Sequence, residues 1–304
     1  MPSREFEELL IQARSNPIDP RKSLVELRQG FDAMGLALAP PEDASFVQVD
    51  ADGVKAEWTR VPESDDTAVL FYLHGGGYIM GSPAGYRDFV AQICRAARVR
   101  ALSVDYRLAP EHPFPAAIED AVQGYRWLLA RHVVPSRIVI AGDSAGGGLT
   151  LSTLLALKED GIPQPAAAIC LSPSTDLTRT ASSITTKATE DVFLTRELLD
   201  VCFDNYLGPG GDPRNPLASP LYADLTGLPP LLIMVGTAEI LLDDSTRLAG
   251  KAKESGVEVE LQVAEGMIHV WSFFASVIPE GKHGVETIGA FIRKRLHRRD
   301  QEAV

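Results

Sequence analysis

The residues Gly142-Asp143-Ser144-Ala145-Gly146 have the types and spacing of a serine nucleophile held on a sharp turn. The apolar run 137–141 before them favours a strand, and the run 149–158 after them favours a helix. This is the context that a G-x-S-x-G motif needs to expose a reactive serine. The turn strains the backbone of the serine, so the positions two residues away on each side must lack a Cβ. We therefore predict Ser144 as a covalent nucleophile; the alternative is a turn of small residues without chemistry.

A glycine-rich segment upstream could stabilise the charge that develops in acyl transfer. His74-Gly75-Gly76-Gly77 follows the apolar, strand-like run 68–73. Successive glycines let backbone N–H groups turn toward a ligand, and fixed N–H donors stabilise a carbonyl oxygen that becomes negative. We predict Gly76, Gly77 and Ala145 as these oxyanion-hole donors. A phosphate-binding loop is the alternative, but neither a Lys-Ser/Thr pair nor G-x-G-x-x-G spacing is present.

A general base must come from one of the six histidines. His269 lies in the loop beyond the alternating, strand-like run 257–263, and an α/β sheet places catalytic groups in such loops. His283 also falls after this late strand, but it lies in a predicted turn at 279–284 and is expected to be exposed. His74 precedes the glycines and is expected to anchor their loop by hydrogen bonding. We therefore predict His269 as the base.

The third member of a triad would be a carboxylate that holds the imidazole in one tautomer and stabilises its charged form. Glu239 is the first carboxylate after the strand-like run 231–235, which fits the chain order Ser, Asp or Glu, His. Asp243 and Asp244 are the alternatives. Both stand where the next helix would begin, so their alternative role is to cap or stabilise that helix. We predict Glu239, with Asp243 kept as the rival.

Strands and helices alternate along the rest of the chain. The predicted order is strand 67–73, helix 84–97, strand 99–104, helix 115–131, strand 137–141, helix 149–158 and strand 166–171. This alternation predicts a mostly parallel sheet covered by helices on both faces. The pattern breaks at 176–219, which is rich in Thr, Ser, Gly and Pro and contains a short amphipathic helix at 195–206. We interpret this stretch as a cap inserted into a catalytic domain at 41–304, with residues 1–40 as the N-terminal part of the cap.

Three motifs together resemble the hormone-sensitive-lipase-like carboxylesterases, the bacterial family IV. They are His74-Gly75-Gly76-Gly77, Asp105-Tyr106-Arg107-Leu108-Ala109-Pro110-Glu111 and Gly142-Asp143-Ser144-Ala145-Gly146-Gly147. The similarity covers about residues 69–270 and implies an α/β-hydrolase fold with a helical cap and serine hydrolysis of small esters. By position it assigns the triad to Ser144, Glu239 and His269. The usual family acid is Asp in an Asp-Pro-Leu-type motif, whereas this chain has Glu239-Ile240-Leu241.

The cap is expected to determine which esters fit. Apolar residues of the cap and of the glycine-rich loop are predicted to contact the substrate or, alternatively, to form the core of a small lid. The predicted contacts are Tyr78, Phe193, Leu194 and Phe203, with Phe6, Met34 and Tyr206 as further candidates. Asp105 and Arg107 are predicted to form a buried pair that locks the fold rather than a catalytic one.

Composition excludes several other classes of protein. An apolar fraction of 45% and a charged fraction of 23% are typical of a globular protein, and 304 residues can bury one large core. A net charge of −12 argues against a nucleic-acid partner. The 3 cysteines form no C-x-x-C pair, so neither a disulfide framework nor a metal site is predicted. No apolar run resembles a signal peptide or a membrane span, which predicts a cytoplasmic protein without a membrane partner.

The predicted substrate is a short- to medium-chain carboxylic ester, hydrolysed without a metal or an organic cofactor. A lactone, amide or peptide hydrolase would use the same residues with a different pocket, and a lactonase is the nearest alternative. A ligand-binding protein on the same scaffold would lack the catalytic histidine, and His269 argues against it. Similar esterases often form homodimers through an edge strand, which residues 257–263 would provide here.

Overall fold

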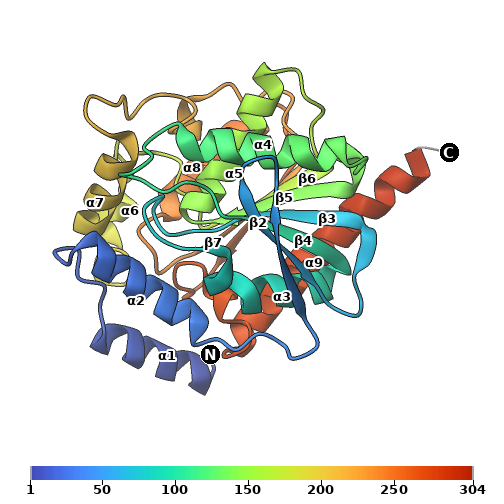
Figure 1. Cartoon of the computed structure of the whole chain (residues 1–304). Coiled ribbons are helices and arrows are strands. Elements are labelled where there is room, and N and C mark those ends of the chain that lie inside the picture. The colour runs from blue at the N-terminus through green and yellow to red at the C-terminus, as the bar shows by residue number, and fades with distance from the viewer. Residues whose placement is uncertain (1, 303–304) are drawn as a thin grey trace.

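The computed structural model describes residues 2–302, and their side chains as far as residue 296. Within this part of the chain the strands form one 8-stranded sheet in the order β1-β2-β4-β3-β5-β6-β7-β8 (Figure 1). The strands are β1 (Ser45–Asp50), β2 (Lys55–Arg60), β3 (Asp65–Leu73), β4 (Val99–Val104), β5 (Ile138–Asp143), β6 (Ala167–Leu171), β7 (Leu231–Gly236) and β8 (Val259–Ala264). Strands β3 to β8 run parallel, so their carboxyl ends meet at one edge of the sheet.

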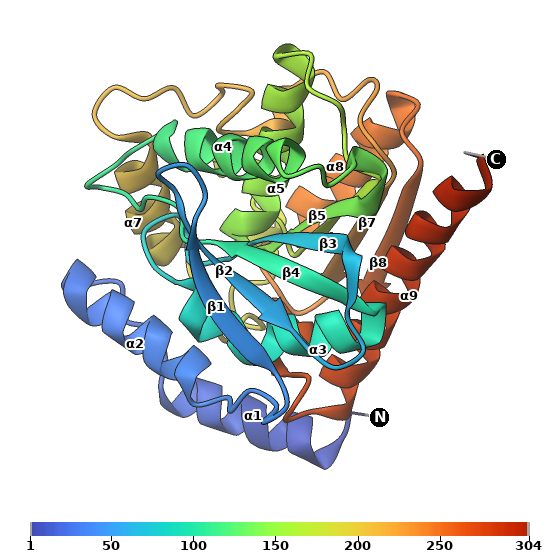
Figure 2. The same cartoon turned by 45° about the vertical axis from the view of Figure 1, so that its right-hand side comes forward.

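Helices cover both faces of the sheet, as predicted from the alternation of segments. The helices in the described part of the chain are α1 (Arg4–Ser15), α2 (Leu24–Leu36), α3 (Arg87–Ala97), α4 (Ala116–Ala130), α5 (Ala145–Glu159), α6 (Ser183–Thr186), α7 (Arg196–Leu207), α8 (Leu242–Glu254) and α9 (Pro279–Glu302), with short 3-10 turns η1 (Pro83–Tyr86), η2 (Pro135–Arg137), η3 (Pro220–Tyr222) and η4 (Trp271–Phe274). Helices α4, α5 and α8 lie on one face, and α3 and α9 lie on the other (Figure 2).

The central strands are apolar on both sides because both faces are buried. In β3, Phe71 and Leu73 contribute to the core under α4 and α5, whereas Leu70 and Tyr72 contribute to the core under α3 and α9. This alternation follows from the period of two residues along a strand. The two cores hold the sheet rigid behind the loops at its carboxyl edge.

A hairpin at the start of the sheet was not foreseen from the sequence. Strand β1 pairs with β2, and β2 pairs with β4, both in antiparallel register. The turn between β1 and β2 contains Asp52 and Gly53, both with positive φ, at 56° and 93°. An Asp-Gly pair is a strong hairpin signal, so the sequence did contain the information needed to place these strands.

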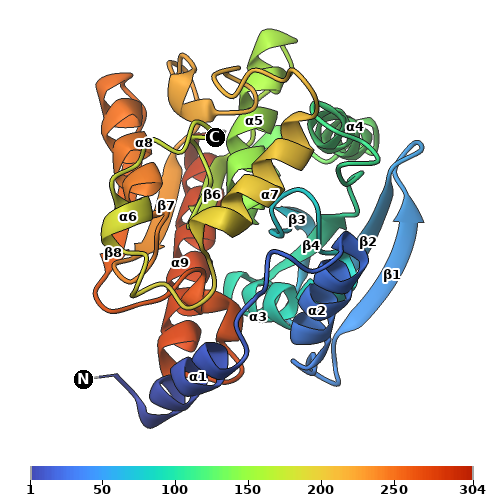
Figure 3. The same cartoon turned by 90° about the vertical axis from the view of Figure 1, so that its left-hand side faces the viewer.

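The remaining helices gather beside the carboxyl edge of the parallel strands. Helices α1, α2, α6 and α7 lie on this side of the molecule, the first two from the N-terminus and the last two from the segment 176–219 (Figure 3). The amphipathic helix predicted at 195–206 is α7. No helix in the described part of the chain is both long and apolar enough to span a membrane.

Two predictions about local structure were wrong. The side chain of His283 is exposed, as predicted, but the residue lies within α9 rather than in a turn. Gly281 and Gly284 allow the helix to pack closely against Trp271 and are not turn residues. Arg107 does not form the predicted buried pair with Asp105. It is partly exposed and bonds Asp120, at 2.8 Å.

Candidate active site

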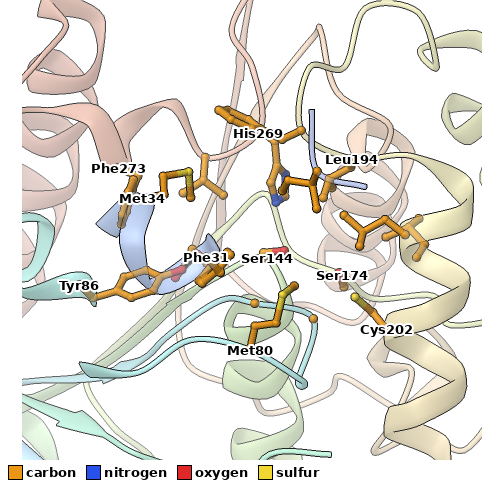
Figure 4. Close-up of a pocket in the computed structure, with 18 of the residues that line it drawn as sticks. Phe31, Met34, Met80, Tyr86, Ser144, Ser174, Leu194, Cys202, His269 and Phe273 are labelled. Atoms are coloured by element: carbon orange, nitrogen blue, oxygen red, sulfur yellow. Dashed lines mark hydrogen bonds between the residues drawn. The ribbon is translucent and has the colours of Figure 1, made fainter. Parts of the chain in front are cut away.

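The serine motif forms a strained turn between β5 and α5. Ser144 has φ 53° and ψ −120°, values that cost a non-glycine residue about 1–3 kcal/mol and occur mostly at functional sites. A Cβ on Gly142 would collide with the backbone of Gly146, and a Cβ on Gly146 would collide with the backbone of Leu73. These contacts explain why the motif needs glycines at both positions. The turn leaves Ser144 partly exposed in a pocket (Figure 4).

The glycine-rich loop lines the same pocket as Ser144. Gly76 and Gly77 both line the pocket, with φ of 112° and 63°. A Cβ on Gly76 would collide with the backbone of Met80, and a Cβ on Gly77 with the side chain of Cys202. Ala145 is buried as the first residue of α5, where helix N–H groups have no partner within the helix.

Asp143 joins the glycine-rich loop to the serine turn, a role that we did not predict although the residue lies inside the motif. Its carboxylate accepts hydrogen bonds from the N–H of Gly75 at 3.0 Å and from the hydroxyls of Tyr72 at 2.7 Å and Tyr86 at 2.8 Å. Burial raises the pKa of Asp143, although these hydrogen bonds oppose the rise. The network fixes the distance between the two loops.

His74 anchors the same loop from its other end, as expected. Its Nδ1 lies 2.8 Å from the carbonyl oxygen of Gly75, and its ring stacks on Tyr106 at 4.2 Å between centroids. The hydroxyl of Tyr106 in turn donates to the carbonyl of His74 at 2.8 Å. Burial lowers the pKa of His74 to about 4, so the ring is neutral and serves in packing.

His269 and Glu239 form a buried pair at the carboxyl ends of β8 and β7. His269 Nδ1 lies 2.8 Å from Glu239 Oε2. The second oxygen, Oε1, accepts hydrogen bonds from the N–H of Gly236 at 2.6 Å and from the hydroxyl of Ser172 at 2.8 Å. Ser172, which sequence reasoning missed, also accepts the N–H of Val270 at 3.1 Å. Both the carboxylate and the imidazole loop are therefore fixed.

The environment of His269 favours its charged form. Burial by itself lowers the pKa of the imidazole, but the hydrogen bond to Glu239 and the negative charges of Glu239, Asp191 and Asp143 outweigh it, and the net pKa is raised. Figure 4 shows the ring pointing toward Ser144. No hydrogen bond joins these two side chains among the described residues. Such bonds often tighten only when substrate is bound.

The rival carboxylates do not contact the imidazole. Asp243 accepts the N–H of Ser183 at 2.9 Å, and Asp244 accepts the N–H groups of Thr175 at 2.7 Å and Asp176 at 2.9 Å. Both thus tie the segment that follows β6 to the start of α8. Of the three acidic candidates, Glu239 is the one that bonds His269.

The pocket above Ser144 is narrow and mainly apolar, with a volume of about 80 Å³. Phe193, Leu194 and Phe203 line it, and so does Met34. Tyr78 is not among the lining residues: its ring is buried and stacks on Tyr206 at 3.7 Å between centroids. Lining residues that sequence reasoning missed are Ile18, Phe31, Met80, Tyr86, Ser174, Leu198, Leu199, Cys202, Val270, Phe273 and Phe274. The spacing of the four lining residues on α7, at 198, 199, 202 and 203, is the helical signal that could have found part of this set.

The chain is similar to known hydrolases and esterases. A family model described as an alpha/beta hydrolase fold matches residues 70–273. An acetyl-hydrolase from Streptomyces hygroscopicus is 43% identical over 290 residues, which is 95% of this chain and 94% of that protein. An esterase from Acinetobacter venetianus is 36% identical and spans 79% of this chain and 78% of its own length.

Solved structures of esterases are similar to this chain over almost its whole length. The crystal structure of an esterase from the bacterial hormone-sensitive lipase family has a TM-score of 0.94 and 46% identity, and it covers 97% of this chain and 99% of its own. The structure of EstE5 soaked with p-nitrophenyl butyrate has a TM-score of 0.93 and 43% identity over the same shares. The chain therefore belongs to the α/β-hydrolase family and, within it, to the bacterial hormone-sensitive lipase family. The predicted fold and family are confirmed.

Proposed function

We propose that this protein hydrolyses short- to medium-chain carboxylic esters through an acyl-enzyme formed on Ser144. The observation that carries the proposal is the convergence of three separate loops on one pocket. The turn with Ser144, the glycine-rich loop and the His269–Glu239 pair all meet at the carboxyl edge of the sheet. The relatives named as esterases support the class of carboxylic ester hydrolase.

In the proposed reaction each group acts once when the acyl-enzyme forms and once when it is hydrolysed. His269 takes the proton of the Ser144 hydroxyl as its oxygen attacks the ester carbonyl, and Glu239 stabilises the resulting imidazolium. The N–H groups of Gly76, Gly77 and Ala145 hold the oxyanion. His269 then gives the proton to the departing alcohol, and water attacks the acyl-enzyme by the same route to release the acid.

The dimensions of the pocket support a small acyl or alcohol group beside Ser144. A volume of about 80 Å³ is small compared with the roughly 300–1,000 Å³ of pockets that enclose whole drug-sized ligands. The lining is mainly apolar, so it favours uncharged esters of aliphatic acids over charged substrates. Either the acyl or the alcohol part of the ester must therefore be small.

We further propose a homodimer that pairs through β8, in a cytoplasmic setting. β8 is an edge strand of the sheet, and edge strands carry unpaired backbone groups that can add another strand. Val263 on this strand is 45% exposed, which gives the edge an apolar contact point. The molar mass of the native protein, measured by light scattering, tests the dimer: a monomer at all concentrations would contradict it.

The function is tested with p-nitrophenyl acetate, butanoate, octanoate and palmitate. We expect initial rates to peak at short or medium chains and to vanish in the Ser144→Ala variant, whose circular dichroism should match that of the wild type. Turnover that survives in a folded Ser144→Ala variant would overturn the assignment of the nucleophile. A folded wild type without turnover on any of these esters would overturn the esterase itself.

A further inference from the structure

A cavity at the amino end of β4 is separate from the pocket of Ser144. Its volume is about 520 Å³, and it lies between β1, β2, β4 and the carboxyl end of α4. Two tryptophans line it, Trp58 of β2 and Trp127 of α4, together with two arginines, Arg100 and Arg131. Arg100 is the second residue of β4, whereas Ser144 follows the last residue of the parallel strand β5. The sheet therefore separates the two sites, and we call this one the tryptophan cavity.

Each arginine of the tryptophan cavity stacks on an indole ring. Arg100 Cζ lies 4.3 Å from the ring centroid of Trp58, and Arg131 Cζ lies 3.7 Å from that of Trp127. The two indole centroids are 6.2 Å apart. A cation over an aromatic face is attracted by the electrons of the ring. The stacks therefore orient both guanidinium groups by their faces and leave the N–H groups, which radiate in the guanidinium plane, to other acceptors.

The buried donors of the cavity lack acceptors. Arg100 Nε and Trp127 Nε1 are sealed from solvent, and neither has a hydrogen-bond partner among the described residues. Asp65 and Asp66 act on Arg100 only at longer range, since both carboxylates pair with other arginines. Burial and the like charge of Arg60 lower the pKa of Arg100. A buried donor without an acceptor is unfavourable, so these groups are better satisfied when a ligand supplies oxygen atoms.

The rest of the lining indicates what kind of ligand fits. Among the described lining residues Asp50 is the one acid, and its carboxylate accepts the N–H of Gly53. Two cations and one carboxylate leave the cavity positive in a chain whose net charge is −12, which favours an anion. The other walls are apolar, formed by Val49, Leu128 and Val133. A volume of about 520 Å³ is typical of cavities for small organic molecules rather than for one inorganic ion.

We infer that the tryptophan cavity binds a small organic anion, whose charged group pairs with Arg100 and Arg131 and whose hydrocarbon part contacts the apolar walls. A carboxylate and a phosphate monoester share this chemistry, because both present oxygen atoms that match the N–H groups of a guanidinium. The inference does not depend on the proposed esterase function, since the cavity shares no lining residue with the pocket of Ser144.

The test is isothermal titration calorimetry on the whole protein with four probes. Phenylacetate and benzyl phosphate are the two organic anions, benzyl alcohol is the uncharged analogue, and inorganic phosphate is the ion without a hydrocarbon part. The wild type is compared with Arg100→Met and Arg131→Met, which keep an apolar stem and remove the charge. Arg126→Met is the matched control, because Arg126 is an exposed arginine of the same helix α4 that pairs with Asp160. Thermal melting checks the folding of each variant.

We expect phenylacetate, benzyl phosphate or both to bind the wild type, and the one that binds identifies the charged group. Affinity should fall by about tenfold or more in Arg100→Met and in Arg131→Met, the size expected for losing a hydrogen bond to a charged group. Arg126→Met should bind as the wild type does, and benzyl alcohol should bind more weakly than either anion that binds.

Three results would overturn the inference. The first is the absence of binding heat with both organic anions, and the second is equal affinity in the wild type and both cavity variants. The third is inorganic phosphate or benzyl alcohol that binds as tightly as the organic anion. Arg131 is exposed, so Arg131→Met decides the matter even where Arg100→Met does not fold. An anion that entered the pocket of Ser144 instead would bind all variants alike and give the second result.

Discussion

The two walls of the pocket are built in different ways. On the sheet side, the triad acid and the loops beside it are held by hydrogen bonds to the backbone. Glu239 accepts the N–H of Gly236 at 2.6 Å, and Asp143 accepts the N–H of Gly75 at 3.0 Å. On the side of the α1–α2 hairpin and α7, the lining is made of apolar side chains such as Met34 and Leu198. Apolar contacts are not directional, so this wall can change its shape more easily than the sheet side.

Two charged residues join the two walls by hydrogen bonds to the backbone. Arg28 of α2 donates to the carbonyl of Ile79 at 2.8 Å and to that of Ala109 at 3.0 Å. Asp191 accepts the N–H of Phe193 at 2.9 Å on the cap side and that of Ile240 at 2.9 Å, next to Glu239. We therefore expect substitutions on the sheet side to change kcat and those on the cap side to change KM and substrate preference.

The largest effect is expected when Glu239 is replaced. Glu239→Ala should lower kcat by about 10³–10⁴-fold, because His269 loses the partner that fixes its tautomer and stabilises its charge. Asp243→Ala is the matched control, since Asp243 bonds Ser183 rather than His269. Initial rates on p-nitrophenyl butanoate check this, and an equal loss in both variants would contradict the proposed acid.

The next effect concerns Gly77, where the two walls touch. A Cβ there collides with Cys202 of α7, so Gly77→Ala should displace the oxyanion loop and lower kcat by roughly 10²-fold. The double variant Gly77→Ala/Cys202→Gly removes the colliding atoms and should regain part of the rate. If kcat does not recover at all, the contact with α7 is not what positions the loop.

A smaller effect is expected in the pH profile. The negative charge of Asp191 helps to raise the pKa of His269, and only the neutral imidazole can accept a proton from Ser144. Activity therefore falls as the pH drops through this raised pKa. Asp191→Asn should lower the pKa and move the acid limb of kcat/KM to lower pH. Asp160→Asn, at an exposed site far from the pocket, should leave the profile unchanged. An acid limb that stays in place in Asp191→Asn would show that the charge does not reach His269.

The smallest effect is expected on the cap side. Arg28→Met removes two hydrogen bonds to carbonyls and an ion pair with Glu111 at 2.6 Å, which should lower the free energy of unfolding by about 1–3 kcal/mol. KM should rise several-fold with kcat nearly constant, because α2 lines the pocket but carries no reacting group. Arg21→Met, which breaks an exposed pair with Asp19, should change neither quantity. Urea unfolding measures the change in the free energy of unfolding, and steady-state kinetics measure KM and kcat. A fall in kcat alone would contradict the proposed role of Arg28 in holding α2.

Much of the fold could be predicted because its signals are local. Buried parallel strands are apolar runs, and the serine turn has a fixed pattern of glycines, so β3 to β7 and the elbow could be placed from the sequence. The β1–β2 hairpin was missed although Asp52 and Gly53 marked its turn. The predicted turn at 279–284 and the predicted buried pair of Arg107 failed for another reason. The packing of α9 and the position of Asp120 depend on segments distant in the chain.

The active site shows the same difference between features that have a local sequence pattern and features that depend on distant segments. The sequence alone determined which residue types could react and in which order they occur, since a strained turn, a glycine-rich loop and a late histidine each leave a local pattern. Only the tertiary structure decided which carboxylate bonds His269, that Tyr78 packs on Tyr206 instead of lining the pocket, and that Phe274 lines it. These facts depend on how loops from different strands and helices converge, and no single stretch of sequence encodes that convergence.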